Sequence, residues 1–239
     1  MNLKDKIAII TGASSGLGRA LSEKFVAEGS TVFGLARRQD RLDTIAEKLG
    51  EQFVPVHCDI QSPASIDSAF AAIMNKTPVV DVLVNNAGLG RFGPIESISV
   101  EDIDVQSEVN VRGVLLCAQH VAPVMRSQNG KTGFGGHIVN VASIAGLIGN
   151  AEISVYNATK FAVRGLSEAL MKELRNDGIK VSCIFPGTFD TEFFDTAGVE
   201  MRGRAMTVDA VAETVMHVVQ TPDNYLISEV TMRPLRTSS

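Results

Sequence analysis

Glycine recurs three times in the stretch Thr11-Gly12-Ala13-Ser14-Ser15-Gly16-Leu17-Gly18, which follows the apolar run Ile7–Ile10. Glycines here let the backbone turn tightly and approach a diphosphate, whose charge lies against the N–H groups of a helix terminus. The spacing is Gly-x-x-x-Gly-x-Gly, not the Gly-x-Gly-x-x-Gly of the commonest dinucleotide motif. An ordinary structural turn is the alternative, but the position directly after a buried strand favours dinucleotide binding.

Short β-branched runs alternate with helical stretches along the rest of the chain. The expected strands are Ile7–Thr11, Thr31–Ala36, Phe53–His57, Val79–Val84, His137–Val141, Lys180–Phe185 and Glu229–Met232. Uninterrupted apolar strands and strand–helix–strand alternation predict a doubly wound, Rossmann-like α/β fold with a parallel sheet and helices on both faces. We find no internal repeat or long linker, so the 239 residues are expected to form one domain. Its cofactor half would span about 1–110 and its catalytic and substrate half about 111–239.

Side chains that favour helix starts mark three boundaries, and two connectors interrupt the pattern. Ser62, Ser99 and Thr207 are expected to cap helices with their hydroxyl groups. The segment Ser127–Gly136 is polar and glycine-rich, so we expect a surface excursion before a strand. The segment Gly187–Met206 is unusually apolar for a connector.

Composition places the chain among globular proteins, with 45% hydrophobic and 21% charged residues. The formal net charge of −5 argues against nucleic acid or an anionic membrane as a partner. No apolar run approaches the roughly 18–20 residues that span a membrane. Cys58, Cys117 and Cys183 are far apart in the sequence and are expected to be buried thiols, and no histidine lies in metal-ligand spacing. We therefore expect a cytoplasmic protein without a metal site.

The end of the second expected strand reads Leu35-Ala36-Arg37-Arg38. Dinucleotide folds place a carboxylate here for a ribose 2′-hydroxyl, or an arginine for a 2′-phosphate. This chain has two arginines and no acid, so the pattern favours NADP(H) over NAD(H). The alternative is a solvated pair ahead of the helix expected at Asp40–Leu49.

The stretch Tyr156-Asn157-Ala158-Thr159-Lys160 places a phenol and an ammonium one helical turn apart. An ammonium near a phenol favours the phenolate, so we expect Lys160 to lower the pKa of Tyr156 from its usual value of about 10. The phenol would then serve as an acid or base near neutral pH. The alternative is an ordinary charged helix face formed by Lys160, Arg164, Glu168 and Lys172, with Tyr156 at its start.

Ser143 favours the catalytic alternative. Ser143, the glycine-rich stretch and Asn85-Asn86-Ala87-Gly88 each follow the carboxyl end of a separate expected strand. That edge of a doubly wound sheet is where ligands bind.

Together, these motifs make the chain resemble the short-chain dehydrogenase/reductase family over essentially its whole length. The resemblance rests on Thr11–Gly18, Asp59, Asn85–Gly88, Asn110, Ser143, Tyr156, Lys160 and Pro186-Gly187, in the order and at the spacing usual for the family. It implies a seven-stranded parallel sheet, a homodimer or homotetramer, and a small carbonyl or alcohol substrate.

The resemblance also implies four catalytic residues. Tyr156 would donate a proton to the substrate carbonyl oxygen, or accept the alcohol proton in the reverse direction. Ser143 would hydrogen-bond the same oxygen. Lys160 would lower the pKa of Tyr156 and bind the nicotinamide ribose, and Asn110 would hold a water that links Lys160 to solvent.

The remaining implied contacts fall into two groups. The cofactor would meet Gly12, Ser14, Ser15, Gly16, Leu17, Gly18, Arg37, Arg38, Asp59, Ile60, Asn86, Ala87, Gly88, Tyr156, Lys160, Pro186, Gly187, Phe189 and Thr191. The substrate would meet Ser143, Ile144, Ile153, Tyr156 and Phe193, with Leu89, Phe92, Ile148, Phe189 and Phe194 as further candidate walls. Because position 15 is serine and not a basic residue, selection of the 2′-phosphate would rest on Arg37 and Arg38.

The expected function is an NADPH-dependent oxidoreductase that interconverts a ketone or aldehyde and an alcohol, a carbonyl reductase or alcohol dehydrogenase. Two narrower alternatives are a 3-oxoacyl thioester reductase and a 3-hydroxy acid (serine-like) dehydrogenase, for which Arg91 or Arg202 could meet a carboxylate. A protein that only senses NADP(H) is the non-enzymatic alternative.

Overall fold

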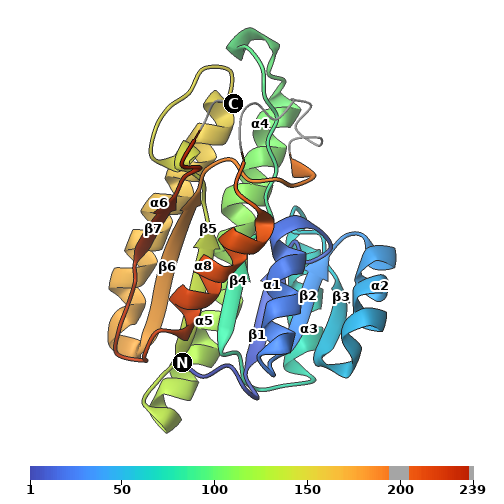
Figure 1. The fold of residues 1–239 in the computed structure, drawn as a ribbon, viewed down its shortest axis with the longest axis vertical. Coiled ribbons are helices and arrows are strands. Elements are labelled where there is room, and N and C mark those ends of the chain that lie inside the picture. Colours follow the sequence, from blue (N-terminus) through green and yellow to red (C-terminus); the bar gives the residue numbers. More distant parts are fainter. Residues whose placement is uncertain (194–204, 237–239) are drawn as a thin grey trace.

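Seven strands form one parallel sheet in the computed structural model, which describes residues 1–193 and 205–236 (Figure 1). The strands are β1 (Ile7–Thr11), β2 (Thr31–Ala36), β3 (Phe53–His57), β4 (Val82–Asn85), β5 (Gly136–Val141), β6 (Ile179–Pro186) and β7 (Glu229–Met232). Their order is β3-β2-β1-β4-β5-β6-β7. The order reverses direction between β1 and β4, and the expected doubly wound sheet is confirmed.

The start of β4 differs from the sequence expectation, which included Val79 and Val80. Pairing with β1 begins only at Val82, which lies opposite Ala8. The residue before it, Asp81, instead accepts hydrogen bonds through its carboxylate from the Ile7 N–H at 2.8 Å and from the Lys6 ammonium at 2.9 Å. The backbone N–H of Asp81 also donates to the Ile7 carbonyl at 2.9 Å, so Asp81 contacts the start of β1 through both its backbone and its side chain.

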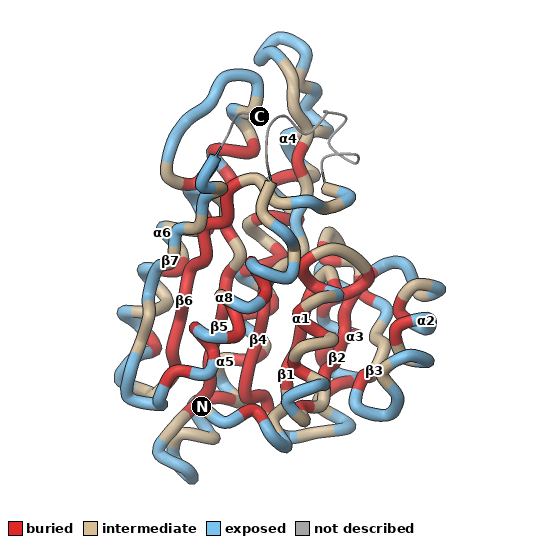
Figure 2. Tube along the Cα trace, viewed as in Figure 1, coloured by how far each residue is buried: buried red, intermediate tan, exposed pale blue. Residues whose placement is uncertain are grey.

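Helices cover both faces of the sheet. One face is packed by α1 (Gly16–Ala27), α2 (Gln39–Leu49) and α8 (Val208–Gln220), and the other by α3 (Pro63–Met74), α5 (Gly113–Thr132) and α6 (Ser154–Leu174). The short helix α4 (Val100–Ser107) runs through a π-helical turn, 108–112, into α5. Figure 2 shows the central strands as the most continuously buried part of the chain. None of the helices in the described ranges is long and apolar enough to cross a membrane.

The expected helix caps are confirmed. The hydroxyl oxygens of Ser62, Ser99 and Thr207 accept hydrogen bonds from backbone N–H groups in the first turns of α3, α4 and α8. The three cysteines are buried free thiols, also as expected.

The expected surface location of Ser127–Gly136 is confirmed, since most of this segment is exposed or half-buried, but the expected connector is wrong because α5 continues to Thr132. The Gln128 side chain explains the extra turn. Its amide donates to the carbonyls of Val80 at 3.0 Å and Gly135 at 2.9 Å, and its oxygen accepts from the Val80 N–H at 2.8 Å. This segment precedes the amino end of β5, so it lies at the edge of the sheet opposite the carboxyl ends (Figure 1).

Candidate active site

A cavity of about 550 Å³ opens at the carboxyl ends of the central strands. It is lined by nearly every residue that the sequence assigned to a cofactor or substrate: Gly12, Ser14, Ser15, Gly16, Leu17, Arg37, Arg38, Asp59, Ile60, Asn86, Ala87, Gly88, Ser143, Ile144, Ile153, Tyr156, Lys160, Pro186, Gly187, Phe189, Thr191 and Phe193. Gly18 and Asn110 lie outside this lining. The structure thus brings together segments from both halves of the chain.

The glycine-rich loop has the shape of a backbone cradle. Gly12 has a φ of +68°, a conformation that side chains disfavour. Gly18 lies behind the loop, where an added Cβ would come 2.3 Å from the Gly12 carbonyl oxygen. At the start of α1, Ser15 makes no side-chain hydrogen bond as a cap. The first N–H groups of the helix are therefore left for a ligand, and this arrangement fits a dinucleotide diphosphate.

Thr11 joins this loop to the segment that follows β4. Its hydroxyl oxygen accepts hydrogen bonds from the N–H groups of Asn86 and Ala87, each at 3.0 Å. The Asn86 side chain donates in return to the Thr11 carbonyl at 2.9 Å. The two backbone segments are thereby held in fixed positions on one side of the cavity.

Cationic side chains gather at the cavity end beside β2. Arg38 donates to the hydroxyls of Ser14, at 3.2 and 3.3 Å, and Ser15, at 2.8 Å. It also pairs with Glu192, together with Arg41 from the first turn of α2. Hydrogen bonds from Arg41, followed by those from Arg38, hold the pKa of Glu192 below its usual value. Arg37 is exposed and, among the described residues, makes no ion pair.

Sequence reasoning missed Arg41 and Glu192. The sequence held only a weak signal for Glu192, because the same connector also holds Asp190, Asp195 and Glu200.

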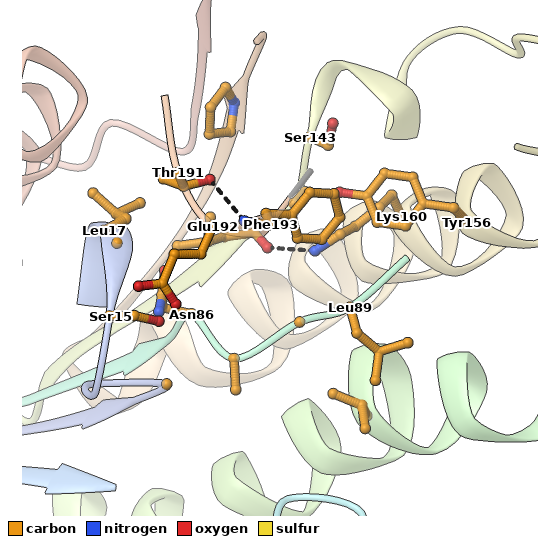
Figure 3. A pocket seen from close by; sticks show the side chains of 18 of the residues that line it. Ser15, Leu17, Asn86, Leu89, Ser143, Tyr156, Lys160, Thr191, Glu192 and Phe193 are labelled. Carbon is orange, nitrogen blue, oxygen red and sulfur yellow. Dashed lines mark hydrogen bonds between the residues drawn. The ribbon is translucent and has the colours of Figure 1, made fainter. Parts of the chain in front are cut away.

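Tyr156 lies in the first turn of α6 and is 8% exposed, and its ring packs in a cluster with the rings of Phe193 (Figure 3) and Phe92. The ring centre of Phe92 is 5.4 Å from that of Tyr156, and the ring centre of Phe193 is 5.6 Å from it. Burial raises the pKa of the Tyr156 phenol to about 12, while a hydrogen bond to Ser143 acts in the lowering direction.

The expected acidification of Tyr156 by Lys160 is wrong for this structure. The Lys160 ammonium lies 5.6 Å from the centre of the tyrosine ring, and it donates to the Val141 carbonyl at 3.0 Å. The lysine side chain is itself buried, which lowers its pKa to about 8. The two groups are close neighbours as expected, but burial outweighs any stabilisation of a phenolate.

Ser143 begins a short helical turn after β5, and its position is fixed from two sides. Its hydroxyl oxygen accepts from the Ala145 N–H at 3.1 Å. The following loop is held by Asn157, whose side-chain amide donates to the carbonyls of Ala145 at 2.6 Å and Ile148 at 2.8 Å. Asn157 is thus a further residue that shapes the site, and its position beside Tyr156 was the only signal for it in the sequence.

Asn110 lies in the π-helical turn, almost fully buried. Its side-chain oxygen accepts from the Leu89 N–H at 2.9 Å, and its amide donates to the Leu89 carbonyl at 2.8 Å and to the Thr159 hydroxyl at 3.1 Å. The side chain therefore ties the segment after β4 to the tyrosine helix. The expected water link to Lys160 stays a prediction.

The substrate end of the cavity is largely apolar. Ile144, Ile153, Phe189 and Phe193 line it as expected, together with Leu89 and Phe92. Ile148 does not, because its side chain is 43% exposed on the surface. Phe194 and Arg202 lie outside the described residues. Arg91 lines the cavity and pairs with Asp102 at 3.6 Å.

Comparisons with known proteins agree with this geometry. A family model described as short chain dehydrogenase matches residues 6–201. An uncharacterized oxidoreductase of Staphylococcus epidermidis is 32% identical over 234 residues, covering 98% of this chain and 99% of that protein. A serine dehydrogenase complexed with NADP⁺ superposes with a TM-score of 0.89 at 31% identity, covering 96% of this chain and 95% of the other. A 3-ketoacyl-(acyl-carrier-protein) reductase from Brucella melitensis, complexed with NADH, has a TM-score of 0.89 at 30% identity and covers 98% of both chains.

Proposed function

This chain belongs to the short-chain dehydrogenase/reductase family, and on that premise we propose that it is an NADPH-dependent enzyme that interconverts a carbonyl compound and an alcohol. The observation that carries the proposal is the meeting of Ser143, Tyr156 and Lys160 in one cavity with the glycine-rich loop. A solvated helix face would leave Tyr156 and Lys160 exposed, yet both are buried.

Tyr156 holds the proton that the reaction moves. A phenol with a pKa near 12 is protonated at neutral pH, so it is ready to donate from its oxygen to a substrate carbonyl oxygen. Ser143 donates a second hydrogen bond to that oxygen, where negative charge develops during reduction. In the reverse direction Tyr156 accepts the alcohol proton. Because the pKa of the phenol is raised, its ionised form is populated only at alkaline pH, so alcohol oxidation is faster there.

A nicotinamide cofactor fits the residues of the cavity. The glycine-rich loop and the start of α1 would bind its diphosphate, and Lys160 its nicotinamide ribose. Arg37 and Arg38 would bind a 2′-phosphate, which supports NADP(H) over NAD(H). When bound, the cofactor exchanges a hydride with the carbon atom of the carbonyl or alcohol.

Phe92 and Phe193 beside Tyr156 support a substrate with an apolar part next to its carbonyl group. A 3-hydroxy acid, or the corresponding 3-oxo acid, is the second candidate. Two observations favour it: the similar serine dehydrogenase, and Arg91 in the cavity lining, whose guanidinium could meet a carboxylate. A 3-oxoacyl thioester is the third candidate, supported by the similar ketoacyl reductase.

The deciding experiment mixes the protein with NADPH and a panel of ketones, 3-oxo acids and 3-oxoacyl thioesters, and follows the loss of nicotinamide absorbance. Tyr156→Phe should abolish turnover and leave NADPH binding intact. Tyr225→Phe, at an exposed tyrosine, is the matched control and should keep full activity. NADPH binding without turnover of any carbonyl compound would instead support a sensor protein.

We also propose an oligomeric state and a cellular compartment for the protein. The exposed Leu115 of α5 and Phe161 of α6 support a homodimer or homotetramer, since each keeps about two fifths of its surface accessible in the single chain. The three free thiols support a reducing compartment such as the cytoplasm. Light scattering on the purified protein measures the assembly, and Leu115→Glu should shift it toward the monomer.

A further inference from the structure

Glu192 joins the segment after β6 to the arginines beside β2. Its two carboxylate oxygens lie 2.9 and 2.7 Å from one terminal nitrogen of Arg41. One of these oxygens also lies 3.3 Å from Arg38. Figure 3 shows the Glu192 side chain reaching across the cavity to the side of Ser15.

The Glu192 carboxylate is thus bound as an anion by a cluster of hydrogen-bond donors. Arg38 contacts the hydroxyls of Ser14 and Ser15 at the same time as Glu192, so two guanidinium groups and two hydroxyls gather around one spot. Guanidinium groups bind carboxylates and phosphates with the same fork of N–H donors. In a dinucleotide fold, the end of the second strand is where a 2′-phosphate would lie.

We propose that Glu192 is a cofactor-specificity residue whose carboxylate takes the place of the 2′-phosphate and competes with it for Arg38 and Arg41. The inference rests on the proposed function, because it assumes that the cavity binds a nicotinamide dinucleotide. NADP(H) must displace the carboxylate to reach these arginines. NAD(H) has a hydroxyl at that position and leaves the ion pairs in place. Glu192 therefore narrows the preference for NADP(H) that the arginines create.

The expected effect is modest in size. All three side chains are about half exposed, and exposed ion pairs are weak and screened by salt. A phosphate monoester carries roughly two negative charges at neutral pH, whereas the carboxylate carries one, so the phosphate wins the competition. Removing the competitor should then tighten NADP(H) binding by about three- to tenfold.

The test uses Glu192→Gln, which keeps the size of the side chain and removes its charge. Glu229→Gln is the matched control, because Glu229 also pairs with an arginine, Arg164 at 3.2 Å, but lies on β7 away from the cavity lining. Calorimetry gives the Kd of NADPH, NADH, 2′,5′-ADP and 5′-AMP for each protein. In Glu192→Gln, the two ligands with a 2′-phosphate should bind more tightly, while NADH and 5′-AMP should be unchanged. The control should match the unsubstituted protein for all four.

Equal changes for NADPH and NADH, or no change for either, would overturn the role of Glu192. A different set of binding constants would show that the proposed cofactor preference is wrong. If the unsubstituted protein binds NADH as tightly as NADPH while Glu192→Gln prefers NADPH, the inference holds and the NADP(H) preference of the natural chain is wrong. If the unsubstituted protein prefers NADPH and the substitution changes nothing, the proposed function stands and the inference fails. Binding of neither dinucleotide by any variant rejects both.

Discussion

The Lys160 ammonium donates a hydrogen bond to the backbone carbonyl of Val141 at 3.0 Å. This contact joins the helix that carries Tyr156 to the end of β5, two residues before Ser143. The lysine is 5% exposed, so it is a buried cation with a backbone oxygen as its acceptor. The candidate catalytic residues are therefore positioned by a cation whose burial is energetically unfavourable.

That burial predicts a pH dependence of stability. Burial lowers the pKa of Lys160 from 10.5 to about 8 in the folded protein. Between these two values the unfolded chain binds the proton and the folded chain does not, so this group makes stability rise with pH. Lys160→Met lacks the effect. Denaturant unfolding at several pH values measures the free energy of unfolding of both proteins. From pH 8 to 10.5, the value for the natural chain should rise relative to the value for Lys160→Met by up to about 3 kcal/mol. A constant difference would contradict the lowered pKa.

Ser143→Ala should affect both catalysis and the titration of Tyr156. Loss of a donor to the developing oxyanion lowers kcat by about a hundred- to a thousandfold. Loss of the hydrogen bond to Tyr156 also raises the pKa of the phenol further, because that bond acts in the lowering direction. Alcohol oxidation, which needs the ionised phenol, should therefore shift to higher pH.

The titration is measured by phenolate absorbance in a Tyr225→Phe background, where Tyr156 is the sole tyrosine of a chain that has two. The background protein should show little ionisation at pH 10 while it stays folded, and Ser143→Ala still less. Half-ionisation of Tyr156 near pH 8 would restore the acidification by Lys160 that the sequence suggested.

Arg37→Ala should weaken NADPH far more than NADH. Arg37 is exposed at the cavity and, within the described part of the chain, has no ion pair to break, so its full charge is available to a 2′-phosphate. Loss of one charged hydrogen bond should raise the Michaelis constant for NADPH by about ten- to a hundredfold. Arg126→Ala, which removes an arginine paired with Asp177 at the end of α5, is the control. Equal effects of Arg37→Ala on the Michaelis constants of both cofactors would show that Arg37 does not select the 2′-phosphate.

Gly18→Ala should disrupt the glycine-rich loop. The new Cβ would lie 2.3 Å from the Gly12 carbonyl oxygen, so the loop must shift and dinucleotide binding should be lost or strongly weakened. Gly165→Ala is the matched control on α6, where a Cβ meets no atom within 4 Å. That control should bind normally and gain about 0.5–1 kcal/mol of stability from its better helix propensity. Calorimetric binding and thermal unfolding of both variants check the prediction.

Local chemistry made the architecture predictable. Buried parallel strands need continuous apolar runs, and four of the seven strands have the bounds read from those runs. Helix starts at Ser62, Ser99 and Thr207 were predictable because a cap acts over only three residues. Ser143 and the glycine-rich loop were predictable as site residues for a similar reason, since each follows a strand whose carboxyl end lies at one edge of the sheet.

Contacts between distant segments decided the rest. The last turn of α5 depends on the bond between Gln128 and Val80, 48 positions apart, which no local pattern reveals. The pairing of Glu192 with Arg41 spans 151 positions. The pKa of Tyr156 depends on how much water the surrounding rings exclude, and that is a property of the packed cavity. The sequence by itself determined the strands, the glycine-rich loop and the order of the candidate catalytic residues, because these depend on neighbours along the chain. Only the tertiary structure decided the pKa values of Tyr156 and Lys160 and the pairing of Glu192 with Arg41, because charge interactions and desolvation depend on distance through space.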